Sequence, residues 1–138
     1  MDAQLPLFPV RLTRTQRDSL MTCAHRAATL TVEELLAVSR RHLNAAADAH
    51  QGNPFVNLRL ATALFDTIER VTKVWETLAP HVRLWFAGAI MHFAASDDDE
   101  PDFTSPIGFD DDAEVLNACL RFAGYDDLCV NPEAYNDV

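Results

Sequence analysis

The chain is poor in glycine and in cysteine. It has four glycines in 138 residues and few runs of β-branched residues, which argues against an all-β fold with many tight turns. Its three cysteines, Cys23, Cys119 and Cys129, are odd in number and form no Cys-x-x-Cys pair. We therefore expect neither a disulfide framework nor a thiolate metal site, and we predict a reducing, cytoplasmic location.

Long apolar stretches are also missing. The longest one extends from Leu84 to Ala95. As a helix it would span about 18 Å, whereas the hydrocarbon core of a bilayer is about 30 Å thick. The N-terminus has no basic segment followed by an apolar one, so we expect no signal peptide. We interpret the apolar stretch as a buried core helix and predict no transmembrane segment.

The last third of the chain has almost no basic residues. Residues 96–138 contain one, Arg121, against thirteen acids, a net charge of −12, whereas residues 1–95 have a net charge of +2; the whole chain therefore carries −10. A strongly acidic segment disfavours nucleic acid and anionic membranes as its partners. It suits a cation, a basic protein surface or water, and we expect no direct binding to nucleic acid.

Motifs that identify a reaction are absent too. The sequence has no Walker or dinucleotide-binding glycine motif and no Gly-x-Ser-x-Gly. None of its five histidines belongs to a His-x-x-x-His or a His-Glu-x-x-His arrangement. The sequence therefore assigns no catalytic residue.

Helical periodicity is the strongest pattern that the sequence does contain. It predicts a single all-α domain over residues 1–138, a bundle of about five helices with an extended arm at 1–12 and an irregular tail at 125–138. The predicted helices span residues 14–29, 32–50, 54–78, 80–95 and 111–123. We place the two with the broadest apolar faces, 54–78 and 80–95, at the centre. The expected core residues are Phe65, Ile68, Trp75, Trp85, Ile90 and Phe93.

Capping residues indicate where these helices begin. A polar side chain just before a helix accepts its free backbone N–H groups, and proline is tolerated at the first helical position. The expected caps are Thr13 or Thr15, Thr31 with Glu34 in a capping box, Asn53 before Pro54, and Asp110 or Asp111.

An acidic segment precedes the last predicted helix. Its carboxylates could converge on a hard cation, because Mg²⁺ and Ca²⁺ need several carboxylate oxygens around one point. The candidate metal ligands are Asp98, Asp102, Asp111 and Asp112. Their spacing is not that of an EF-hand, since the glycine and glutamate that such a loop requires are missing from the corresponding positions.

The same carboxylates have two other interpretations. Acids at the amino end of a helix accept free N–H groups and favour the positive end of the helix dipole. We expect this structural role for Asp102 and Asp111, in which case no metal is needed for folding. The acids could also form a surface for a basic partner.

His92 lies in the apolar helix predicted at 80–95, one turn before the acidic segment. A histidine in such a position is expected to be a core residue bonded to a backbone or carboxylate partner. The alternative is that it supplies a ligand or a proton to a site in the acidic segment.

The order of residues in the acidic segment resembles the YkvA-like family of bacterial proteins of unknown function. The hallmark of that family is Asp-x-x-Pro-Asp followed by Gly-x-x-Asp-Asp between two helices. The matching positions are Asp98, Pro101, Asp102, Gly108, Asp111 and Asp112, and the resemblance covers residues 89–122. Asp99 and Glu100 depart from the apolar residues usual in the family, so the loop here is more polar. The resemblance implies a small bacterial helical domain and supplies no established activity.

Three interpretations of function remain for such a domain. The leading interpretation is a non-enzymatic domain that acts through protein interaction, its acidic third meeting a basic protein surface. The alternative is a divalent-metal-dependent hydrolase that uses the loop carboxylates. An acidic decoy that occupies a nucleic-acid-binding protein is a third reading. The sequence assigns neither a partner nor an oligomeric state.

Overall fold

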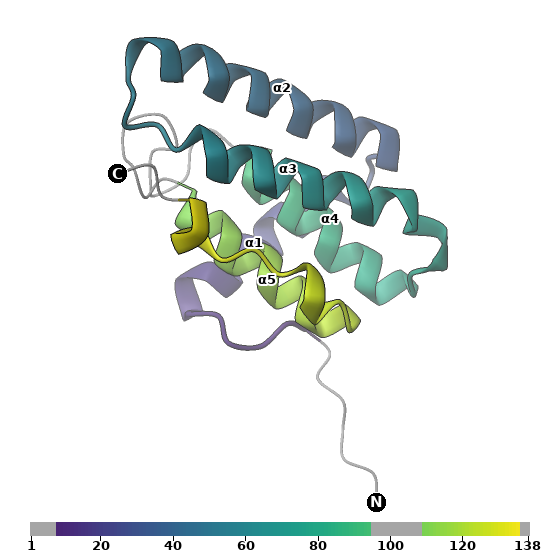
Figure 1. The fold of residues 1–138 in the computed structure, drawn as a ribbon. Coiled ribbons are helices and arrows are strands. Elements are labelled where there is room, and N and C mark those ends of the chain that lie inside the picture. Colours follow the sequence, from purple (N-terminus) through teal and green to yellow (C-terminus); the bar gives the residue numbers. More distant parts are fainter. Residues whose placement is uncertain (1–7, 95–108, 136–138) are drawn as a thin grey trace, which may run out of the picture.

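The structure, a computed structural model, describes residues 8–94 and 109–135. These ranges contain helices and no β-strand, so the predicted all-α fold is confirmed (Figure 1). The α-helices are α1 (Arg14–Ala27), α2 (Val32–Gly52), α3 (Leu58–Lys73), α4 (Pro80–Ala94) and α5 (Asp110–Ala123). Three short 3-10 helices are η1 (Trp75–Thr77), η2 (Asp126–Leu128) and η3 (Pro132–Tyr135).

α4 lies at the centre of the bundle, where α1, α2 and α5 all pack against it. Its residues from Phe86 to Ile90 are buried without a break. Consecutive residues on a helix point in different directions, so a helix buried in this way must be covered on several sides.

No helix in the described parts of the chain is long and apolar enough to cross a membrane.

A glycine sets the distance between α1 and α4. A Cβ atom at Gly88 would lie 2.9 Å from the Cβ atom of Ala24 and 3.0 Å from Cδ1 of Leu20. Such separations are shorter than real Cβ contacts, so no other residue fits at this position without displacing α1. Small residues on both helices therefore allow their backbones to approach closely.

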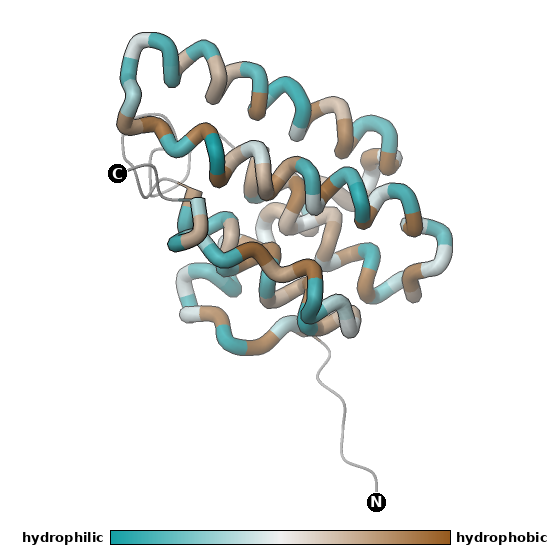
Figure 2. The backbone as a smooth tube through the Cα atoms, in the orientation of Figure 1, coloured by the Kyte–Doolittle hydropathy of each residue, from teal (hydrophilic) through white to brown (hydrophobic). Residues whose placement is uncertain are grey.

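α3 is an outer helix, which corrects the prediction that it shares the centre with α4. It packs mainly against α2, and its opposite face is exposed. Figure 2 shows hydrophilic and hydrophobic residues alternating along α2 and α3, as in helices with one face on the core. The exposed face carries Arg59, Asp66 and Arg70. Charged side chains are costly to bury, so this face remains in water.

The start of α3 also differs from the prediction. Asn53 ends α2, where its backbone N–H donates to the carbonyl of Ala49. Asn57 caps α3 instead, because its Oδ1 accepts a hydrogen bond of 3.1 Å from the backbone N–H of Leu60. Val56 is fully buried between the two asparagines. Burial of this side chain takes the residues after Asn53 into a turn, so the helix begins at Leu58.

The cap predicted at Asp110 or Asp111 is wrong. Phe109 occupies the cap position of α5 and makes no capping hydrogen bond through its side chain. Its ring is buried, with its centroid 5.9 Å from that of Phe93 and 6.0 Å from that of His42. Burial of this ring places the start of α5 directly after Phe109. The acids then lie in the first turn, where they still favour the helix dipole.

The other predicted features agree closely with the structure. Thr13 and Thr31 both form capping boxes. Five of the six expected core residues are buried, namely Phe65, Ile68, Trp75, Ile90 and Phe93. Trp85 is half-buried and packs against this core. The tail departs from the prediction that it is irregular, since its described residues contain η2 and η3.

Substitution of Gly88 tests the close approach of α1 and α4. We expect Gly88→Ala to lower the free energy of unfolding by about 1–3 kcal/mol, the usual cost of overfilling a packed contact. Gly52→Ala is the matched control, since a Cβ atom there meets nothing within 4 Å. Urea unfolding measures both, and the control should be neutral or slightly stabilising. A Gly88→Ala variant as stable as the control would contradict the close approach.

Candidate functional site

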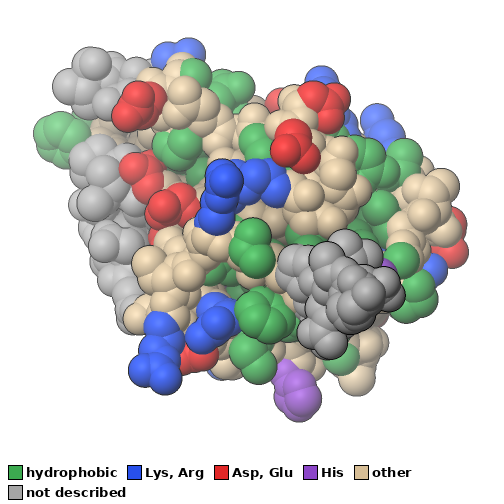
Figure 3. Space-filling model, turned by 90° about the horizontal axis from the view of Figure 1, so that it is seen from below, with side chains coloured by type: hydrophobic (Ala, Val, Ile, Leu, Met, Phe, Trp, Pro, Cys, Tyr) green, Lys and Arg blue, Asp and Glu red, His purple; other side chains and the backbone are tan. Residues whose placement is uncertain are grey.

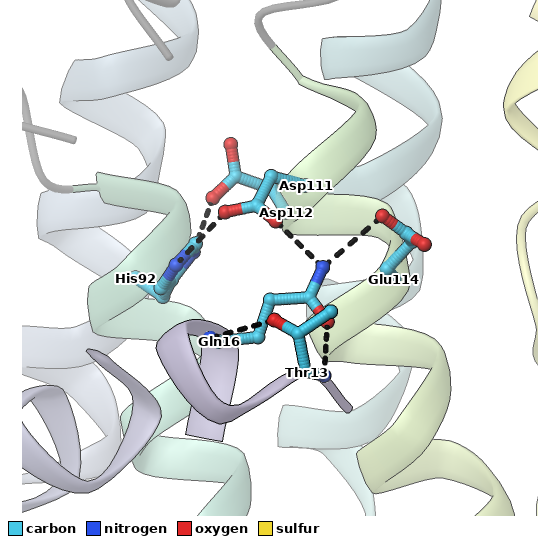
Figure 4. Close-up of polar contacts among 6 residues, drawn as sticks. All are labelled: Thr13, Gln16, His92, Asp111, Asp112 and Glu114. Carbon is cyan, nitrogen blue, oxygen red and sulfur yellow. Dashed lines mark hydrogen bonds and ion pairs between the residues drawn. The ribbon is translucent and has the colours of Figure 1, made fainter. Parts of the chain in front are cut away.

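The predicted acidic ligands are only partly within the described structure. Asp98 and Asp102 lie outside the described residues, as do Pro101 and Gly108. Asp111 and Asp112 lie in the first turn of α5, and their side chains point toward His92 on α4 (Figure 4). Two of the four candidate ligands are therefore brought together, and both lie beside His92.

His92 and Asp112 form a buried pair. The side chains are 2% and 1% exposed, and His92 Nδ1 lies 2.5 Å from Asp112 Oδ1. Because a carboxylate oxygen accepts, the imidazole N–H donates in this bond. Hydrogen bonds to ionised groups are among the strong ones, and strongest where water is excluded. This is the carboxylate partner expected for a core histidine.

Asp111 and Gln16 extend this pair into a network that joins α5 to α1. Asp111 Oδ1 accepts a hydrogen bond of 2.7 Å from Gln16 Nε2, and its Oδ2 lies 3.6 Å from His92 Nε2. Gln16 Nε2 also donates to Glu114 at 3.1 Å, while its Oε1 accepts from the backbone N–H of Thr13 at 2.9 Å. One glutamine thus connects the cap of α1 to the first two turns of α5 (Figure 4).

This network corrects the role expected for Asp111. Its carboxylate binds a side chain of another helix and does not cap its own helix. Among the residues that the structure describes, no group of three or more His, Cys, Asp and Glu side chains is arranged to hold a metal ion. A metal at Asp112 would also compete with the buried imidazole that already binds this carboxylate.

A second feature, which sequence analysis did not predict, is a cleft on the outer side of α3. Its volume is about 620 Å³, which is within the usual range for ligand sites. One side is the exposed face of α3, from Leu58 to Arg70, with His50 at the end of α2. The other side is the C-terminal segment from Asp127 to Tyr135, which passes between α3 and α5 in Figure 1.

A single asparagine holds the C-terminal side of this cleft in place. Asn117 on α5 donates from Nδ2 to the carbonyl of Val130 and accepts at Oδ1 from the Val130 N–H, both at 2.7 Å. The Cys129 thiol donates to the backbone carbonyl of Asn117 at 3.7 Å. These bonds fix a segment that has little regular structure of its own.

The lining of the cleft is both apolar and charged. Leu58, Ala63 and Val130 supply apolar contacts, while the charges come from Arg59, Asp66, Arg70 and Asp127. Burial raises the pKa of the Cys129 thiol, and the nearby Arg121 guanidinium offsets only part of this effect. The thiol is therefore protonated at neutral pH and is not an activated nucleophile.

Nothing local in the sequence indicates this cleft. A polar face on an amphipathic helix has the same pattern whether it meets water alone or borders a recess. The deciding contact joins residues 117 and 130 through a side-chain amide. A polar residue in a helix and a valine in a tail give no signal that they pair.

Comparisons of the chain with protein families, with curated proteins and with solved structures find no match. The functional argument therefore rests on the His92 network and on the cleft.

The His92 network predicts that Asp111 and Asp112 contribute unequally to the free energy of unfolding. Asp112→Ala should lower the free energy of unfolding by about 3 kcal/mol or more, because it leaves a buried imidazole without its partner. Asp111→Ala removes a half-exposed carboxylate and should cost about 1 kcal/mol. Urea unfolding of both variants measures the difference. Equal losses would contradict the assignment of Asp112 as the buried partner.

Proposed function

We propose that this chain is a non-enzymatic interaction domain that takes up a short segment of a partner protein in the cleft between α3 and the C-terminal segment. The observation that supports this best is the way the cleft is built. One side is a helix face, and the other is a segment held by the paired hydrogen bonds of Asn117. A recess fixed before binding loses little conformational freedom when a ligand enters.

The cleft is bordered by two Asp and two Arg side chains, and its carboxylates can pair with basic residues of a partner. Asp66 projects from α3 and Asp127 belongs to the opposite side, so carboxylates border the cleft from both directions. Figure 3 shows the face seen from below, where acidic, basic and hydrophobic side chains are interspersed. That face offers no single-sign patch, whereas the cleft combines charge with a concave apolar surface. Interfaces depend on pockets that lose their water on binding more than on surface charge alone.

The polar side chains of the cleft suit binding better than catalysis. Cys129 holds its proton, as described above. The Nδ1–H of His50 donates to the carbonyl of Val56 at 2.9 Å. Both side chains are therefore already bonded to backbone carbonyls, and catalysis by covalent attack needs a nucleophile whose pKa is lowered.

A random peptide library selected against the folded protein tests the proposal. We expect enriched peptides that bind the wild type and lose affinity for Thr62→Trp, because Thr62 is exposed and borders the cleft. Ala45→Trp is the matched control, since Ala45 is exposed on α2 and does not border the cleft. Fluorescence anisotropy of the enriched peptides measures binding to all three proteins. If no peptide is enriched, or if the enriched peptides bind both tryptophan variants equally, the proposal that the cleft is the binding site is wrong.

A divalent-metal-dependent hydrolase is the second candidate. The observation that favours it is that Asp111 and Asp112 stand together beside His92 at the amino end of α5 (Figure 4). The competing observation is that the buried imidazole already binds Asp112. We therefore expect EDTA to leave the melting temperature unchanged. If EDTA lowers the melting temperature and added Mg²⁺ or Ca²⁺ restores the original value, metal binding is shown and the hydrolase is favoured over the interaction domain.

A further inference from the structure

The most exposed large apolar residue in the described parts of the chain is Phe55. It is 64% exposed and lies in the turn between α2 and α3. Single apolar residues are ordinary on protein surfaces and need no special explanation. The position of Phe55 matters because the turn that carries it adjoins one end of the cleft.

Hydrogen bonds and one buried side chain fix this turn. The backbone N–H of Phe55 donates to Asn53 Oδ1 at 3.1 Å, and the N–H of Val56 donates to the Asn53 carbonyl at 3.1 Å. The Val56 side chain is fully buried, and its carbonyl accepts a hydrogen bond of 2.9 Å from the His50 ring. An aromatic side chain held on a fixed backbone loses little conformational freedom when a partner covers it.

The end of the cleft beside this turn is lined by His50 and Leu58. His50 is bonded to the turn, and Leu58 is the first residue of α3. Figure 1 shows η3 toward the same end of α3, and Tyr135 at the end of η3 also borders the cleft. Apolar and aromatic side chains therefore gather where the cleft meets the turn.

The charges of the cleft leave this end open to an apolar group of a ligand. Arg59 is next to Leu58 on α3 and already has an interaction partner. Asp66, Arg70 and Asp127 are exposed, so water can solvate them beside a bound segment. An apolar contact at the Phe55 end therefore requires no ion pair between the ligand and these residues.

We infer that the partner segment extends past the His50 end of the cleft and covers Phe55 with an apolar side chain of its own. This inference rests on the proposed function and assigns one residue that determines its specificity. From Leu58 to Arg70 the cleft follows α3 for about 18 Å, which corresponds to about six extended residues. Phe55 is three residues before Leu58, at most about 10 Å away, so a segment of about nine residues reaches it.

Peptides selected from a random library test the inference against the full chain. The library consists of peptides of about twelve residues, which are long enough to span the cleft and the turn. Fluorescence anisotropy measures the enriched peptides that lose affinity for Thr62→Trp. We expect Phe55→Ala to weaken their binding about tenfold, because an aromatic contact is removed from the interface. Met21→Ala is the matched control and should leave the affinity unchanged, since Met21 is 52% exposed on α1 and does not border the cleft.

Alanine scanning of an enriched peptide identifies the apolar residue that meets Phe55. Its replacement should weaken binding to the wild type about tenfold and have little further effect on binding to Phe55→Ala, because that contact is already lost. Urea unfolding should give Phe55→Ala the stability of the wild type, since substitutions of exposed side chains usually change stability little. The loss of affinity then reports the contact and not the fold.

Three results would overturn the inference and leave the interaction domain standing. The first is that peptides sensitive to Thr62→Trp bind Phe55→Ala as tightly as the wild type. The second is that Phe55→Ala and Met21→Ala weaken binding equally. The third is that Phe55→Ala lowers the free energy of unfolding, which would assign the ring to the core. Absence of any cleft-dependent peptide would overturn both the inference and the proposed function.

Discussion

The fold depends on how the central helix accommodates one buried imidazole. α4 is covered by α1, α2 and α5, and His92 near its end is 2% exposed. A buried polar group without a partner costs free energy, so the helix that covers His92 must provide one. Asp112 provides it from the first turn of α5, and the Phe109 ring packs beside it against Phe93. The two contacts together determine where α5 begins and how it lies on α4.

The position of α5 in turn determines the cleft. Asn117 is five residues beyond Asp112 on the same helix and holds the backbone of Val130 through two hydrogen bonds. The position of α5 therefore helps to hold the C-terminal segment beside α3. In the proposed interaction domain, stability and binding therefore depend on the same contacts. These contacts lead from His92 through α5 to the C-terminal side of the cleft. Changes at His92 should consequently be transmitted to the cleft without any direct contact with a ligand.

Local patterns in the sequence predicted the helices and most of the core. The capping boxes at Thr13 and Thr31 involve residues three positions apart, and such signals can be read directly. The errors came where a long-range contact decided the outcome. The ring of Phe109 belongs to the core, which displaced the expected aspartate cap. The central placement of α3 was a different kind of error, because the polar face of this helix is visible in the sequence. The partner of His92 lies twenty residues away, and that of Asn117 lies thirteen away, so neither pair had a local signature.

A double-mutant cycle between His92 and Asp112 tests this account most directly. Each single variant, His92→Leu and Asp112→Leu, removes one side of the His92–Asp112 hydrogen bond, whereas the double variant removes both sides. The account predicts that the double variant loses less free energy of unfolding than the two single variants combined, by about 1 kcal/mol or more. Losses that add to within about 0.5 kcal/mol would contradict it, because they would show that the two side chains act independently.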